Sequence, residues 1–117
     1  MIPWAYSSDF IEKNSYMLDE RERILSMIPG DFLAGFIRLV KAFHGLDITG
    51  QLQKIECPTL IIAAENDIVK PPKFGGIIHK SIPDSEVVVM PGSGHAVVLE
   101  DPVGLSKVMH DFIEKHS

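Results

Sequence analysis

The first half of the chain has apolar residues at helical spacing. Between residues 10 and 28 they recur at about every third or fourth position, which predicts one broken helix or two short helices. Pro29-Gly30 then interrupts the pattern. Asp31 is a suitable N-cap for a further helix, and Gly45 is a suitable residue to end it. One face of this helix is apolar and carries Phe32, Leu33, Phe36, Ile37, Val40 and Phe43.

In the second half of the chain the helical spacing of apolar residues gives way to continuous apolar runs. Two continuous apolar runs, Pro58–Ala64 and Glu86–Met90, are typical of strands that are buried on both faces of a parallel sheet. The stretch "PPKFGGIIHKSIP" between them predicts a short helix, and residues 103–115 predict a terminal helix with one apolar face. Glu100-Asp101 would begin that last helix. The order strand, helix, strand, helix predicts a crossover unit with parallel strands.

Composition and charge narrow the class of protein. A chain of 117 residues with 45% hydrophobic residues has room for one small domain. The net charge of −5, without a basic run, argues against binding to nucleic acid or to an anionic membrane. No leader follows Met1, no stretch approaches the roughly 20 apolar residues of a membrane span, and a single cysteine, Cys57, fits a reducing compartment. We therefore expect a cytoplasmic protein, with Cys57 as a small apolar filler at the entrance of the first strand.

Two residues that can carry chemistry follow the two predicted strands. Asp67 lies just after the first strand and His95 just after the second, in "GSGH", where Gly92 and Gly94 allow a sharp turn. Parallel strands end at the same edge of a sheet, so the carboxylate could orient the imidazole as in a nucleophile–histidine–acid triad. Taken alone, Asp67 would fit a plain turn. His95 could be a hydrogen-bonded surface histidine, but the glycines beside it and the flanking pattern argue against that interpretation. The placement of Asp67 and His95 at adjacent strand ends favours the triad. The other histidines show no metal-ligand spacing, so neither a metal nor another cofactor is expected.

The second half of the chain resembles the end of an α/β-hydrolase. "IECPTLIIAAENDIVKPP" is similar to the family's strand that delivers the triad acid, and "IPDSEVVVMPGSGHAVVLEDP" to the next strand with the histidine loop. The order acid then histidine is also the family's. Residues 1–46, including "WAYSSDF", resemble a helical cap of esterase- and lactonase-like members, and residues 47–117 the C-terminal α/β segment of the core. The resemblance implies an α/β fold, with Asp67 as triad acid and His95 as general base.

The family's nucleophile motif is absent from this sequence. No serine lies in G-x-S-x-G, and Cys57 is flanked by Ile55 and Thr59 instead of glycines. We therefore expect the C-terminal part of a serine-dependent hydrolase of a carboxylic ester or lactone, inactive alone, whose partner is an N-terminal hydrolase half. The alternative is a non-catalytic module that forms a homodimer through its open strand edges. For either function we expect the Phe32/Phe36/Phe43 stripe to be core, although in a cap such a stripe can face the substrate.

Overall fold

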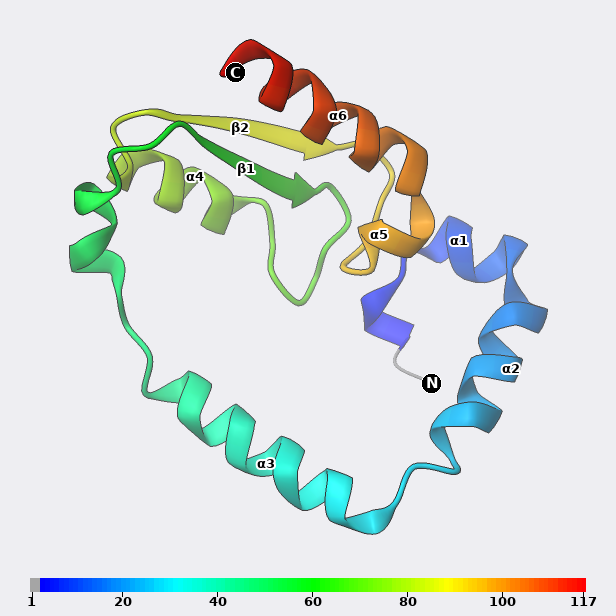
Figure 1. The fold of residues 1–117 in the computed structure, drawn as a ribbon. Coiled ribbons are helices and arrows are strands. Elements are labelled where there is room, and N and C mark those ends of the chain that lie inside the picture. The colour runs from blue at the N-terminus through cyan, green and yellow to red at the C-terminus, as the bar shows by residue number, and fades with distance from the viewer. Residues whose placement is uncertain (1–2) are drawn as a thin grey trace.

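A computed structural model describes residues 3–117 (Figure 1). The expectation that no leader follows Met1 concerns a terminus that lies outside these residues. The elements are, in chain order, η1 Pro3–Ala5, α1 Ser8–Lys13, α2 Ser15–Leu25, α3 Gly30–His44, η2 Thr49–Lys54, β1 Thr59–Ala64, α4 Lys73–Ser81, β2 Ser85–Met90, α5 Val97–Glu100 and α6 Pro102–Lys115. The predicted alternation of strand and helix in the second half is confirmed.

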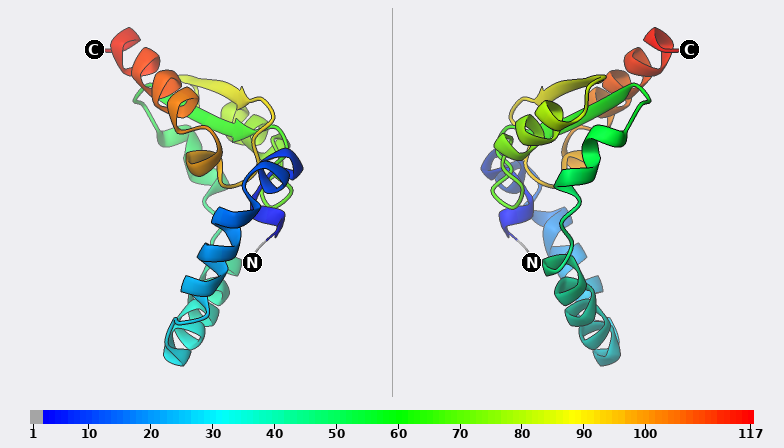
Figure 2. Two further views of the ribbon diagram at one scale, coloured as in Figure 1. Left: turned by 90° about the vertical axis from the view of Figure 1, so that its right-hand side faces the viewer. Right: turned by 90° about the vertical axis from the view of Figure 1, so that its left-hand side faces the viewer.

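Strands β1 and β2 pair in parallel, with Thr59 opposite Ser85 and Ala64 opposite Met90. Helix α4 lies on one face of the sheet and α6 on the other (Figures 1 and 2). Gly75 of α4 is buried against the sheet, where a Cβ would lie 3.4 Å from Ile61 Cγ2 and 3.5 Å from Ala63 Cβ. This layered unit confirms the α/β class and places both strand ends at one edge.

The prediction that both strands are buried on both faces is wrong. In each strand only the last residue, Ala64 or Met90, is buried, and Val89 is exposed. The reason is the size of the sheet, since within residues 3–117 it has two strands and each keeps an open edge. Cys57 is likewise exposed at the entrance of β1, so the prediction that it fills apolar space there is wrong.

Helices α2 and α3 form an arm that runs away from the sheet (Figures 1 and 2). Helix α3 has no buried residue, so its predicted apolar face is exposed to solvent. The helix ends before Gly45 as predicted. The predicted N-cap is wrong: the helix begins at Gly30 behind Pro29, and Asp31 lies in the first turn, where a carboxylate still suits the positive end of the helix.

The arm makes the chain expanded for its length. The radius of gyration is 16.8 Å, against about 13 Å for a compact domain of about 100 residues. The accessible surface is 8604 Å², and the scaling for a folded monomer of this mass gives roughly 6,300 Å². The excess surface includes the apolar face of α3. None of the helices in the described part of the chain combines the length and apolar character needed to cross a bilayer.

Candidate active site

Asp67 and His95 meet at the carboxyl ends of β1 and β2. His95 Nδ1 lies 2.8 Å from Asp67 Oδ2. The other carboxylate oxygen, Oδ1, accepts hydrogen bonds from the backbone N–H groups of Val69 at 2.8 Å and Lys70 at 2.7 Å. Asp67 is therefore held by its own loop on one side and is free to orient the imidazole with the other.

The environment of Asp67 favours its charged form. Burial alone would raise the pKa of this carboxyl, because it penalises the charge. The hydrogen bonds from Lys70 N–H, the His95 ring and Val69 N–H act in the opposite direction and together hold the pKa of Asp67 below its ordinary value. The carboxylate is thus ionised near neutral pH and can only accept hydrogen bonds.

This charge state fixes the tautomer of His95. A carboxylate needs a donor, so Nδ1 of His95 carries the proton and the neutral ring keeps its lone pair on Nε2. The His95 side chain is 44% exposed, whereas that of Asp67 is 8% exposed. The pair therefore combines a basic nitrogen on an exposed imidazole with a buried carboxylate that is hydrogen-bonded to the other ring nitrogen. That is the chemistry of a general base.

The loops after the two strands are joined by further hydrogen bonds. Glu65 Oε2 accepts from Gly92 N–H at 2.7 Å, and Asn66 N–H donates to the Ser93 carbonyl at 2.8 Å. Gly92 has a φ of +68°, a left-handed conformation that side chains other than glycine rarely adopt. The predicted sharp turn is therefore present at Gly92. Glu65 was not a predicted site residue, and its only sequence signal is a carboxylate placed before a glycine turn one strand later.

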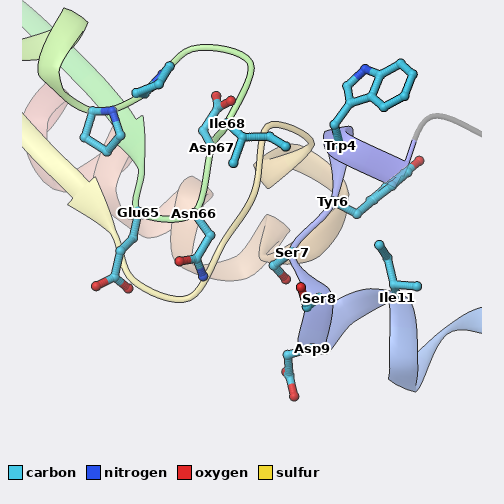
Figure 3. A pocket seen from close by; sticks show the side chains of 12 residues that line it. Trp4, Tyr6, Ser7, Ser8, Asp9, Ile11, Glu65, Asn66, Asp67 and Ile68 are labelled. Atoms are coloured by element: carbon cyan, nitrogen blue, oxygen red, sulfur yellow. The ribbon is translucent and has the colours of Figure 1, made fainter.

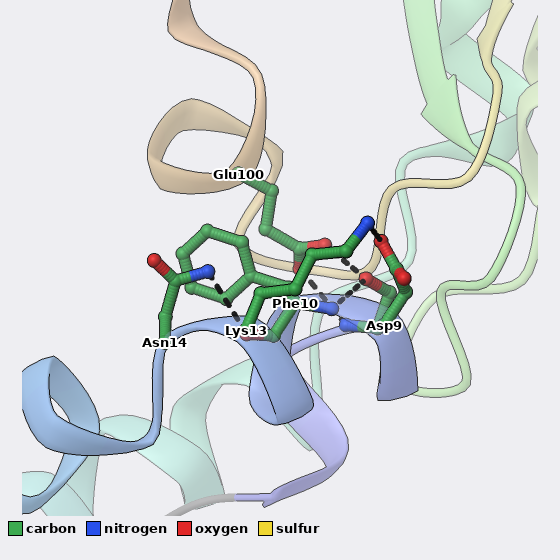
Figure 4. Close-up of polar contacts among 6 residues, drawn as sticks. Asp9, Phe10, Lys13, Asn14 and Glu100 are labelled. Carbon is green, nitrogen blue, oxygen red and sulfur yellow. Dashed lines mark hydrogen bonds and ion pairs between the residues drawn. The ribbon is translucent and has the colours of Figure 1, made fainter.

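Sequence reasoning also missed a contact between the chain's N-terminal segment and the histidine loop. Ser7 donates to Glu100 twice, from N–H to Oε1 at 3.0 Å and from Oγ to Oε2 at 2.6 Å (Figure 4). Glu100 was expected to begin the last helix. Instead it ends α5, and Asp101 caps α6 by accepting from Gly104 N–H at 2.8 Å. No local pattern signals a contact across 93 positions.

An open cavity of about 1110 Å³ lies beside Asp67 (Figure 3). The aromatic side chains of Trp4 and Tyr6 line it on one side, and Ile68 with Asp67 on the other. Its remaining lining is Ser7, Ser8, Asp9, Ile11, Glu65, Asn66, Pro71 and Pro72. The cavity thus joins the N-terminal segment to the loop that carries the acid.

The described residues provide neither a metal cluster nor a nucleophile at this site. Within residues 3–117 no three His, Cys, Asp or Glu side chains are grouped so that they could hold a metal ion. Ser93, the serine nearest to His95 in sequence, is buried, and its Oγ donates to the Pro91 carbonyl at 3.4 Å. The part of the chain that the structure describes therefore contains an acid–base pair without a hydroxyl bonded to it.

Comparison with known proteins identifies the fold. A family model of α/β-hydrolases, described as "TAP-like protein", matches residues 45–117. The chain belongs to this family. Its structure is also similar to that of MGS-M2, an α/β-hydrolase enzyme from a Medee basin deep-sea metagenome library, with a TM-score of 0.91 and 29% identity over 97% of this chain and 42% of that one. The expected α/β-hydrolase resemblance is confirmed.

Two further relatives place this TAP-like chain within the fold. The structure of a thermophilic esterase matches all of this chain and 44% of its own, with a TM-score of 0.70 and 31% identity. A protein of Pseudomonas savastanoi named "Putative carbamate hydrolase RutD" is 28% identical over 111 residues, 94% of this chain and 42% of its own length. The chain thus spans less than half the length of the relatives it matches and corresponds to the C-terminal part of the hydrolase fold.

Proposed function

We propose that this chain supplies the acid and the base of a serine-hydrolase triad that cleaves a carboxylic ester or lactone. The observation that carries the proposal is the hydrogen bond between Asp67 Oδ2 and His95 Nδ1 at the ends of two adjacent parallel strands. A buried, ionised carboxylate behind a half-exposed imidazole is the arrangement that makes Nε2 a proton acceptor. Membership of an α/β-hydrolase family supports the same roles.

In the proposed reaction the serine comes from a hydrolase half that this chain does not contain. His95 Nε2 takes the serine proton as the serine oxygen attacks the acyl carbonyl, and Asp67 stabilises the imidazolium that forms. His95 then gives this proton to the departing alcohol oxygen, which leaves an acyl-serine. A water molecule, deprotonated by His95, then attacks the acyl carbon. The bond from this carbon to the serine oxygen breaks, His95 returns the proton to that oxygen, and a carboxylic acid is released.

The cavity and the relatives support the proposed substrate class. Trp4, Tyr6 and Ile68 give the cavity beside Asp67 aromatic and aliphatic walls, which suit the apolar part of an ester. One relative is an esterase and another is named as a carbamate hydrolase, and both ester and carbamate present an acyl carbonyl with a heteroatom leaving group. We place the complete enzyme in the cytoplasm, where the exposed Cys57 stays a thiol.

A chimera tests this function. The N-terminal part of MGS-M2, which has no counterpart in this chain, is joined to residues 1–117 to supply the serine, and hydrolysis of a nitrophenyl ester is measured. We expect activity in the chimera, none in the isolated chain, and a loss of about 10³-fold or more on His95→Ala. His110→Ala, an exposed histidine of α6, is the matched control and should keep full activity. A folded chimera without hydrolysis, or one unaffected by His95→Ala, contradicts the proposal.

A second candidate function is self-association of this chain alone. The observation in its favour is the excess of roughly 2,300 Å² of accessible surface over a compact monomer of this mass. A stable dimer buries about 1,200–2,000 Å² in total, and the exposed apolar face of α3 is where we expect a second copy to bind. In this case Asp67 and His95 are remnants of a hydrolase triad and have no catalytic role. Sedimentation over a range of concentrations decides the question, because a monomer at all concentrations excludes the dimer.

A further inference from the structure

The N-terminal segment of the chain lies against the loop that carries His95. Residues 4–7 precede α1, and the loop runs from Pro91 through His95 to α5 (Figure 1). Three separate contacts join the two segments, and they lie on both sides of His95 in the sequence. The imidazole itself makes none of them, so any effect on it is indirect.

The strongest of these contacts is the pair of hydrogen bonds between Ser7 and Glu100. Both oxygens of the carboxylate are used, and the 2.6 Å bond from Ser7 Oγ is in the range of a charge-assisted hydrogen bond. Ser7 is 5% exposed, so its hydroxyl and N–H need protein partners. Glu100 provides both partners from the end of α5, five residues after His95.

This pairing exceeds what the N-cap of α1 requires. Ser7 caps the helix by accepting from Phe10 N–H at 3.3 Å, which is the ordinary role of a serine at this position. A cap of this kind needs no carboxylate from a segment 93 positions away. The Ser7 hydroxyl serves both functions, because it donates to Glu100 while it accepts from Phe10.

The other two contacts flank His95 directly. Ala96 N–H donates to the Ala5 carbonyl at 2.7 Å. Gly94 lies so close to the segment that a Cβ there would be 2.6 Å from Ser7 N and 2.7 Å from the Tyr6 carbonyl carbon. The N-terminal segment therefore bonds to the residue after His95 and packs closely against the residue before it.

We propose that Glu100, acting through Ser7, is a positioning residue that holds the His95 loop so that Nδ1 stays on Asp67. Its catalytic meaning rests on the triad proposed above, but the positioning itself does not depend on catalysis. Asp67 is fixed by its own backbone donors, whereas His95 lies in a loop anchored by the N-terminal segment. Loss of the Ser7–Glu100 bonds therefore removes one anchor of the histidine loop and loosens it, although its bonds at Gly92, Ser93 and Ala96 remain. Both backbone donors of Asp67 stay in place.

The test measures the His95–Asp67 hydrogen bond without any substrate. The Nδ1 proton of His95 is observed by NMR in the isolated chain, assigned by its absence from His95→Gln, and its exchange with water is timed. Glu100→Ala removes both bonds to Ser7, and Ser7→Ala removes only the Oγ bond. We expect exchange to accelerate roughly tenfold or more in Glu100→Ala and by a smaller factor in Ser7→Ala. Glu114→Ala, at an exposed glutamate of α6, is the matched control.

The outcomes separate this inference from the proposed function. Unchanged exchange in both variants, with the amide signals of β1 and β2 intact, overturns the positioning role, and so does equal acceleration in Glu114→Ala. If Glu100→Ala loses the strand signals, the milder Ser7→Ala decides. An isolated chain without a protected Nδ1 proton also overturns it. An inactive chimera bears on the reaction alone, because the exchange measurement contains no serine and no ester.

Discussion

A hydrogen bond of 2.8 Å joins Asp67 to His95 across 28 positions of the sequence. The parallel pairing of β1 with β2 makes this possible, because it brings the loops after Ala64 and Met90 to the same edge. The loops are then fixed to each other by the Glu65 N–H bond to the Met90 carbonyl at 3.0 Å. The sheet register therefore brings the two side chains to one edge, where the hydrogen bond forms.

Asp67→Asn should abolish most of the chimera's hydrolysis while it keeps the fold. The amide has one oxygen, so it cannot accept from Val69 and Lys70 and also from His95. The histidine then adopts the wrong tautomer, and we expect a loss of about 10⁴-fold in kcat. Esterase assays and circular dichroism measure the two effects. Asp84→Asn, at an exposed aspartate, is the control, and equal activity in the two variants would contradict the role of Asp67.

Acid should destabilise the chain partly through Asp67. The pKa of this carboxyl is lowered in the folded chain, so between its folded and unfolded values the folded state binds fewer protons. Its contribution to stability is complete above the unfolded value of about 3.9 and is lost as the pH falls through the folded pKa. Urea midpoints between about pH 5 and about pH 3 should therefore fall more steeply in the parent than in Asp67→Asn. If the urea midpoints of the parent and of Asp67→Asn fell equally with pH, a contribution of Asp67 to acid sensitivity would be ruled out.

Three glycine-to-alanine variants should change the free energy of unfolding by amounts that differ in sign and size. Gly94→Ala forces a methyl group against the Ser7 and Tyr6 backbone and should cost roughly 2–3 kcal/mol. Gly92→Ala meets open space but keeps a left-handed φ, which should cost about 1–2 kcal/mol. Gly76→Ala in α4 meets nothing within 4 Å and should stabilise by about 0.5–1 kcal/mol. Urea unfolding gives all three values, and an order with Gly92→Ala costing most would be inconsistent with the close approach at Gly94.

Self-association, if present, should depend on the exposed face of α3. Phe36 stacks on Phe32 with ring centroids 6.5 Å apart, and both are about half exposed. Phe36→Gln removes apolar area that a second copy would bury, so the dimer dissociation constant should rise about tenfold or more. Lys41→Gln, at an exposed polar position of the same helix, should leave it unchanged. Equal effects of the two substitutions in sedimentation would exclude this face as the interface.

Much of the second half was predictable because its signals are local. The apolar runs predicted β1 and β2 to within one residue at each end, and the intervening and final helices were expected where α4 and α6 lie. The proximity of Asp67 and His95 followed from strand order and parallel pairing. The division at residue 46 between a cap-like and a core segment stays a prediction.

The remainder of the site depends on contacts that no local pattern encodes. Glu100 was expected, with Asp101, to begin the last helix, because negative charge suits a helix N-terminus. Its partner is instead Ser7 at the other end of the chain. Cys57 and the α3 face looked like core because they are apolar, and they are exposed because burial needs a second surface. Hydropathy shows which residues can be covered, whereas the covering element decides whether they are.

The Ser7–Glu100 bridge has a consequence for how the arm can vary in length. Residues 8–58 leave the site at this bridge and return at the start of β1, so they form a loop closed at both ends. The entropy of closing such a loop grows slowly, by about 0.6 kcal/mol for each doubling of its length. Insertions or deletions between α2 and α3, or before η2, therefore change the free energy of closing this loop only slightly. We therefore expect that this arm can be lengthened or shortened while His95 stays on Asp67.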